Sequence, residues 1–145
     1  MPSVKPMTNV AFHAQALKRV RRVLRTKCGL RVHQLEPWHV SDFETADGHM
    51  IAVRTAHWAM RKQTVRVHGK TYTYTYKCIQ YNCHEHGKRP KHEPDTWILL
   101  GEKPSEAWII PNHAMQGAKT VRIVATKKPH NRWMRFQGAW ELLTA

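Results

Sequence analysis

Acidic and basic side chains lie close together around a turn at Ala46-Asp47-Gly48. An Asp-Gly turn between apolar runs predicts a β-hairpin, whose second strand is expected at Met50–Thr55. On a hairpin, an acid of the first strand and alternate residues of the second converge at one edge of the sheet. Asp42, with Ala52 and Arg54 opposite, has this layout. Carboxylates can hold Mg²⁺, and a nearby cation can stabilise the charge that develops during phosphodiester hydrolysis, so this edge is the first candidate site.

A second group of residues has the types that bind zinc. It consists of Cys78, Cys83, His84, His86 and His92. A structural zinc site uses two close pairs of ligands joined by a loop, and this spacing matches no standard finger. Zinc binding therefore stays open, and the alternative is a basic loop whose histidines and lysines lie near phosphate.

The composition points to a polyanionic partner. Twenty-four Lys and Arg residues face ten Asp and Glu, which gives a net charge of +14 and a pI of about 10.2. Such a charge attracts nucleic acid and disfavours self-association, although it leaves a homo-oligomer open. No apolar run reaches the roughly 18 residues of a membrane span, and the first residues lack the apolar core of a secretory signal. We expect a cytoplasmic protein of a bacterial or phage-infected cell, not secreted, with free thiols.

A basic helix is predicted to begin at Asn9, after a flexible leader of residues 1–8, and to end before Gly29. Apolar residues fall at helical spacing on one face, namely Val10, Ala14, Leu17, Val20 (or Arg21) and Leu24. The cations of its second half have no acidic neighbour; they are Lys18, Arg19, Arg21, Arg22, Arg25 and Lys27. Basic residues suit a helix C-terminus, but these exceed what capping requires, so part of this face is expected to contact phosphate.

Short apolar or alternating segments after Gly29 predict strands. They are Val40–Phe43, Met50–Thr55, Thr64–Val67, Thr71–Tyr76, Asp95–Leu100, Ala107–Ile110 and Val121–Val124. The tyrosines of Thr71–Tyr76 share one face, which favours packing within a sheet over a platform for base stacking. Residues 81–94 are expected to form a loop, and Asn131–Leu142 a helical end that docks aromatic side chains on the core. The order predicts one α/β or α+β domain over residues 9–145, with a central mixed sheet flanked by the two helical segments.

The hairpin resembles the core motif of the PD-(D/E)XK nuclease superfamily, in particular its small intron-associated and homing-type members. In that pattern an acidic strand and a turn precede a strand of the form apolar, Glu or Gln, Val, Lys, Thr, Ala. The run Ile51-Ala52-Val53-Arg54-Thr55-Ala56 falls in this frame, with Asp42 as the first acid. Pro94–Leu100 is similar to the family's next core strand, and Ala107–Pro111 to the strand that ends in proline. The likeness covers most of the chain from Leu30 onward and implies a restriction-endonuclease-like fold.

Two positions depart from the family's pattern. Ala52 stands where a metal-binding Glu or Gln is expected, and Arg54 where the catalytic Lys is expected. An alanine cannot ligate a metal, and arginine offers a broad, permanently charged fork in place of a compact ammonium. The resemblance therefore implies a nuclease-like fold with a degenerate catalytic centre, whose vestigial catalytic residues are Asp42, Asp47 and Arg54. In an active enzyme, Asp47 or Glu44 would supply the second carboxylate by a shifted register, and Asp42 with Asp47 would hold Mg²⁺. The alternative is that Asp47 and Glu44 are solvated acids near the turn.

Together these observations predict a nucleic-acid-binding protein that prefers double-stranded DNA to RNA and has no membrane partner. The candidate contact residues are Arg19, Arg22, Arg25, Arg54, Arg61, Lys62, Lys88, Arg89 and Lys91. Two alternatives stay open. One is an active Mg²⁺-dependent DNA endonuclease, and the other is a basic structural subunit of a ribonucleoprotein or phage particle.

Overall fold

The computed structural model describes residues 9–84, 92–125 and 132–144 of the chain. The expected leader, His86 of the zinc cluster, and the candidate contacts Lys88, Arg89 and Lys91 lie outside these residues. The helices are α1 (Asn9–Thr26) and α2 (Asn112–Met115), followed by the 3-10 turns η1 (Met134–Phe136) and η2 (Trp140–Leu143). The strands are β1 (Val32–Gln34), β2 (Phe43–Thr45), β3 (Met50–Thr55), β4 (Ala59–Val67), β5 (Lys70–Asn82), β6 (Thr96–Leu100), β7 (Ala107–Pro111) and β8 (Thr120–Val124).

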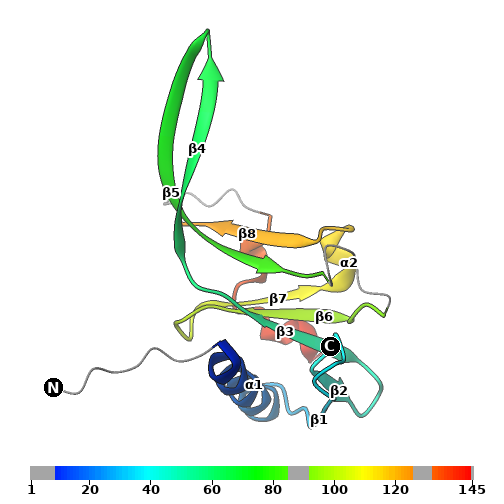
Figure 1. Cartoon of the computed structure of the whole chain (residues 1–145). Helices are drawn as coiled ribbons and strands as arrows, with labels where there is room; N and C mark the ends of the chain where they lie inside the picture. Colours follow the sequence, from blue (N-terminus) through cyan, green and yellow to red (C-terminus); the bar gives the residue numbers. More distant parts are fainter. Residues whose placement is uncertain (1–8, 85–91, 126–131, 145) are drawn as a thin grey trace, which may run out of the picture.

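The strands form two sheets in a single α+β domain (Figure 1). The larger sheet is mixed, with the order β1-β2-β3-β6-β7, and its parallel pair is β3 with β6. The smaller sheet is antiparallel, with the order β4-β5-β8. The expectation of a central mixed sheet is therefore confirmed by the larger sheet. The expectation that all strands belong to that one sheet is wrong, because β4, β5 and β8 form a second sheet. Of the two strands between β3 and β6 in the chain, β4 pairs with β5, and β5 pairs with β8, so neither joins the central strands.

The helix α1 covers one face of the larger sheet, as expected for an N-terminal flanking helix. Its buried residues Ala16, Val20 and Leu24 belong to one apolar core with Ile51 and Val53 of β3. No helix of the described residues is long and apolar enough to cross a membrane.

The start of the predicted apolar face of α1 is wrong. Val10 is 81% exposed, and Ala14 is exposed as well. The buried residues Ala16, Val20 and Leu24 are spaced by four. Because a helix has 3.6 residues per turn, each step of four rotates the buried position slightly around the helix axis. The buried face at the start of the helix therefore contains Ala16, and Ala14 lies on the exposed side.

The other face of the larger sheet forms a second core with the smaller sheet. The residues that meet there include Ala52, Trp97, Leu99, Trp108 and Ile110 from the larger sheet, with Ile79, Tyr81, Val121 and Ile123 from the smaller one. Because β6 is covered on both faces, all five of its residues are buried. This explains its continuous apolar run, which a strand with one solvated face would not tolerate.

Several boundaries differ from those that the sequence predicts. The strand expected at Val40–Phe43 begins only at Phe43, because the chain before it turns, with His39 N–H bonded to Glu36 O. The strand β5 continues to Asn82 because it pairs with β8, so Tyr81 lies in a strand and not in the expected loop. The C-terminal segment forms η1 and η2 instead of a helix, yet its aromatic residues dock on the core as expected. Those residues are Trp133, Phe136 and Trp140.

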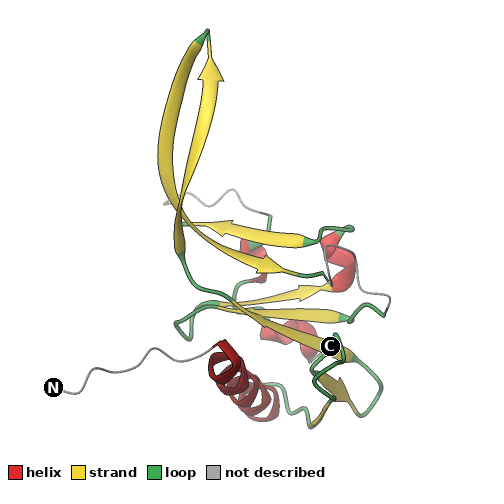
Figure 2. Ribbon diagram, viewed as in Figure 1, coloured by secondary structure: helices red, strands yellow, loops and turns green. Residues whose placement is uncertain are grey.

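The hairpin of β4 and β5 extends beyond the body of the domain (Figures 1 and 2). The strand β5 pairs with β8 only from Cys78 onward, so the preceding part has β4 as its only strand partner among the described residues. We call this two-stranded part, Ala59–Val67 with Lys70–Lys77, the arm. At its tip, His68 and Gly69 both have positive φ, 51° and 76°, as a two-residue type I′ turn requires.

Candidate nucleic-acid interface

The candidate catalytic acid Asp42 lies just before β2, between α1 and β3. Its Oδ2 atom accepts a hydrogen bond of 2.7 Å from the backbone N–H of Val53 and lies 3.7 Å from Arg54 NH1. Its Oδ1 atom lies 3.4 Å from Nε2 of His13 on α1. The predicted meeting of Asp42 and Arg54 at one edge of the hairpin is thus present. His13 is an additional partner that the sequence did not suggest.

Arg54 is held by protein groups on several sides. Its NH1 donates to Val53 O at 3.0 Å, and its NH2 donates to Val40 O at 3.4 Å. The guanidinium also lies over the ring of Trp97, 5.1 Å from its centroid. With a side chain only 25% exposed, Arg54 is placed to stabilise the start of the hairpin more than to reach a nucleic acid.

The other predicted catalytic positions lie elsewhere. Ala52 is fully buried in the second core. Asp47 lies in the turn after β2, at the opposite end of that strand from Asp42, and is hydrogen-bonded to the hydroxyl of Thr45. This bond is the main cause that lowers the pKa of the Asp47 carboxyl. Glu44 belongs to β2 and lines a surface hollow with Arg21 and Arg31.

The residues around Asp42 do not fit a magnesium ion. Mg²⁺ takes oxygen ligands in near-octahedral geometry, commonly with one or two carboxylates. Here a single carboxylate faces a guanidinium and an imidazole, and one of its oxygens already accepts the Val53 N–H. Within residues 9–84, 92–125 and 132–144, no three His, Cys, Asp or Glu side chains are grouped to hold a metal.

The same finding bears on the candidate zinc ligands. Cys78 and Cys83 are buried near the end of β5, and His92 is exposed. These residues and His84 do not form a group of three metal ligands in the part of the chain that is described. His86 lies outside that part.

The cations of α1 fall into two sets. Arg19 donates to Lys103 O and Pro104 O at 3.3 and 3.0 Å, so it anchors the loop between β6 and β7. Arg22 and Arg25 are exposed. Arg25 also lines a hollow of about 360 Å³ together with Arg21 and Arg31. This hollow is a concave and strongly basic surface beside α1.

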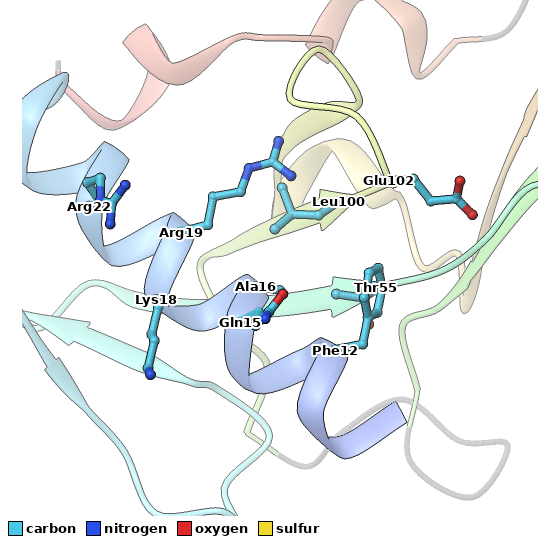
Figure 3. A pocket seen from close by; sticks show the side chains of 10 residues that line it. Phe12, Gln15, Ala16, Lys18, Arg19, Arg22, Thr55, Leu100 and Glu102 are labelled. Carbon is cyan, nitrogen blue, oxygen red and sulfur yellow. The ribbon is translucent and has the colours of Figure 1, made fainter. Parts of the chain in front are cut away.

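A further cavity of about 390 Å³ lies between α1 and the ends of β3 and β6. Figure 3 shows Arg19 extending from α1 toward Leu100, whereas Lys18, which also lines the cavity, points in another direction. At its rim, His57 stacks on Phe12 with ring centroids 4.7 Å apart and contacts Glu102 at 2.7 Å. The acid Glu102 offsets part of the positive charge here.

The arm carries the remaining candidate contacts, Arg61 and Lys62, together with Arg66, Lys70 and Lys77. All five are exposed, and no Asp or Glu occurs from Ala59 to Asn82. In the described structure, neither face of the arm is covered by another element. The arm is therefore, beside α1, a second cationic element without an acid.

The two faces of the arm differ in chemistry. Residues directly opposite each other on antiparallel strands share a face, and the register pairs Arg61 with Tyr76, Gln63 with Tyr74, and Val65 with Tyr72. We call this the tyrosine face; it consists of Arg61, Gln63, Val65, Val67, Lys70, Tyr72, Tyr74 and Tyr76. The threonine face consists of Met60, Lys62, Thr64, Arg66, Thr71, Thr73, Thr75 and Lys77.

The expectation that the tyrosines pack within a covered sheet is wrong. Tyr72 is 54% exposed and Tyr74 47% exposed, because β5 has only β4 beside it at these positions. The contact residues predicted from the sequence do not include Arg66, Lys70 and Lys77. The signal that could have found them is the absence of any acid around an alternating tyrosine segment flanked by cations.

Comparison with other proteins adds no assignment. No family model, curated protein or solved structure was found to match this chain.

Proposed function

We propose that this protein binds nucleic acid, with double-stranded DNA as the preferred form, through the exposed cations of α1 and of the arm. The observation that carries the proposal is the arm: five exposed cations without an acid, on a ribbon that no described element covers. A polyanion is the partner that such a surface attracts. The basic hollow beside α1, lined by Arg21, Arg25 and Arg31, adds a concave surface of the same sign.

Salt dependence of binding tests this function directly. A labelled duplex should bind with a log affinity that falls linearly with log salt, by about 0.9 for each phosphate contact. The variant Lys62→Gln/Arg66→Gln removes two charges from the arm and should make the slope shallower by roughly 1.8. An affinity that does not change with salt would refute the proposal.

A matched control separates local contacts from net charge. The variant Arg132→Gln/Arg135→Gln removes the same charge near η1, where the two side chains lie over Trp133 and Phe136. This control should keep the parent slope. Equal effects of both variants would mean that only the overall charge matters and that the arm makes no contact.

We further propose that the fold is of the PD-(D/E)XK type with a centre that does not cleave DNA. In support, β3 lies parallel to β6 in the larger sheet, and Asp42 meets Arg54 at the edge of the hairpin. The poor fit of these residues to Mg²⁺ argues against the endonuclease alternative. Plasmid incubated with the protein and Mg²⁺ or Mn²⁺ should stay intact, as it does with EDTA. Cleavage that EDTA or Asp42→Ala abolishes would overturn this proposal while leaving DNA binding in place.

A further inference from the structure

The tyrosine face of the arm presents an ordered aromatic row. Tyr74 and Tyr76 have ring centroids 6.2 Å apart, inclined at 46°. The hydroxyl of Tyr74 donates to Gln63 Oε1 at 2.7 Å, which ties the ring to the opposite strand. Tyr72 continues the row toward the tip. These contacts set the positions of the rings, yet about half of Tyr72 and Tyr74 stays open to solvent.

Stabilisation of the hairpin does not account for this exposure. Cross-strand pairs such as Tyr72 with Val65 contribute to a two-stranded ribbon, but they leave about half of the surface of Tyr72 and Tyr74 exposed. A row of exposed aromatic side chains is unusual on a protein surface, whereas the other face carries one exposed apolar side chain, Met60, among solvated threonines and cations. The tyrosine face is therefore the better candidate for a ligand.

The charges of this face indicate what kind of ligand fits. Arg61 lies opposite Tyr76, and Lys70 lies two residues before Tyr72, so a cation flanks each end of the row. Alternate residues of a strand are spaced by about 7 Å, which leaves room for one planar group on each ring. A ligand that offers successive planar groups on an anionic backbone is a single-stranded nucleic acid. The bases of a duplex cannot serve, because their faces are covered by their neighbours in the stack.

We propose that the tyrosine face of the arm binds a single-stranded segment of nucleic acid. Unpaired bases stack on Tyr72, Tyr74 and Tyr76, and the adjoining phosphates lie at Arg61 and Lys70. This inference rests on the proposed nucleic-acid binding and narrows the partner to one that carries unpaired bases, such as a duplex with a single-stranded tail.

Three fluorescently labelled ligands test the inference: a duplex, the same duplex with a thymine tail, and the tail alone. The variant Tyr72→Leu/Tyr74→Leu keeps apolar bulk on the hairpin but removes the planar rings. It should weaken binding of the tail alone by about tenfold for each ring, with less than a twofold change for the plain duplex. Its salt slope should equal that of the parent, because no phosphate contact is removed.

Two matched variants serve as controls. Tyr72→Phe/Tyr74→Phe keeps the rings and should retain binding of the tail. Thr73→Val/Thr75→Val alters the threonine face and should retain it as well. Arg61→Gln/Lys70→Gln, in contrast, should make the salt slope for the tail shallower by about 1.4.

The outcomes separate this inference from the proposed function. A parent protein that binds no duplex contradicts the proposed function itself. A parent that binds the duplex, with a leucine variant that binds the tail as well as the parent does, overturns the stacking inference alone. Equal losses for tail and duplex in the leucine variant also overturn it, since they mean that the tyrosines support the arm and do not recognise unpaired bases.

Discussion

The guanidinium of Arg54 lies 3.7 Å from the carboxylate of Asp42 and is fixed there by two backbone carbonyls. The two charges compensate each other where β2 begins and β3 nears its end. In the PD-(D/E)XK frame the same two positions would face substrate and metal. Here the pair links the residue before β2 to β3. We therefore expect its main measurable role to be structural.

Removal of the Asp42 charge should destabilise the fold. Asp42→Asn eliminates the attraction to Arg54 and weakens the hydrogen bond from Val53 N–H, and the side chain is only 15% exposed. We expect a loss of about 1–2 kcal/mol in the free energy of unfolding, measured by urea denaturation. Glu102→Gln is the control, because its pair with His57 is 55% exposed on both sides. That variant should lose less than about 0.5 kcal/mol; equal losses would contradict a structural role for Asp42.

An acid introduced at position 52, where the proposed PD-(D/E)XK fold would have a metal ligand, should destabilise the protein. Ala52 has no exposed surface and belongs to the core that contains Trp97, so Ala52→Glu buries a carboxylate among aromatic and aliphatic groups. We expect a loss of at least about 3 kcal/mol, because the carboxylate loses its hydration there and the nearby Arg54 guanidinium is already held by Asp42 and two backbone carbonyls. Ala46→Glu places the same acid in the exposed turn and should be tolerated. An Ala52→Glu protein with parent stability and a new affinity for Mg²⁺ would argue instead for a metal site that needs only this ligand.

The hydroxyl of Thr45 should control the titration of Asp47. The hydrogen bond between them lowers the pKa of the Asp47 carboxyl in the folded state. The associated stability is present above the pKa of the unfolded chain and is lost as the pH falls through the folded pKa. In Thr45→Val the Asp47 pKa should rise toward its ordinary value, as a titration followed by NMR at the carboxyl carbon would show. An unchanged midpoint would mean that the backbone, and not Thr45, sets this pKa.

The arginines of α1 should differ in their effects. Arg22→Ala/Arg25→Ala removes two exposed side chains and should make the salt slope for duplex binding shallower, with little change in stability. Arg19→Ala removes the donor to Lys103 O and Pro104 O, so it should lower the unfolding midpoint and change the slope less. Fluorescence anisotropy and urea denaturation on the same samples distinguish the two. The reverse pattern would place Arg19 at the phosphate and exclude Arg22 and Arg25.

The hydroxyl of Tyr81 should be dispensable. It is buried, and no described group is hydrogen-bonded to it. Burial, together with the nearby Glu106 carboxylate, raises the pKa of this phenol far above its usual range, so it stays protonated. Tyr81→Phe should leave the unfolding free energy unchanged or raise it by up to about 1 kcal/mol. A clear loss of stability would reveal a partner for the hydroxyl.

The sequence predicted those elements that can be recognised from their own residues alone. The strands β3 and β6 were placed correctly at Met50–Thr55 and, within a residue, at Thr96–Leu100, because continuous apolar runs of this length arise where both faces of a strand are covered. The end of α1 before Gly29 followed from the glycine's ability to adopt positive φ, here 66°.

Features that depend on distant pairing could not be read in the same way. An alternating segment such as Thr71–Tyr76 shows which residues share a face, but not whether another layer covers that face. The pairing of β5 with β8, which separates the second sheet from the first, joins Cys78 to Val124 across a long stretch of chain. Likewise, the hairpin pattern around Asp42 predicted that Arg54 lies beside it. The contact of Asp42 with His13 could not be predicted, because it depends on how α1 packs on the sheet.

The arm leaves the domain at Ala59 and returns at Cys78, and these two residues are register partners. A change of length made in opposed pairs, two residues from each strand, therefore leaves both anchor points, the faces of the arm and the geometry of its turn unchanged. The reach of the arm can be shortened or extended by about 7 Å at a time while the two cores of the domain keep their packing. Reach and stability are thus separately adjustable in this fold, and the same ribbon could be exchanged for one of another length without redesign of the domain that holds it.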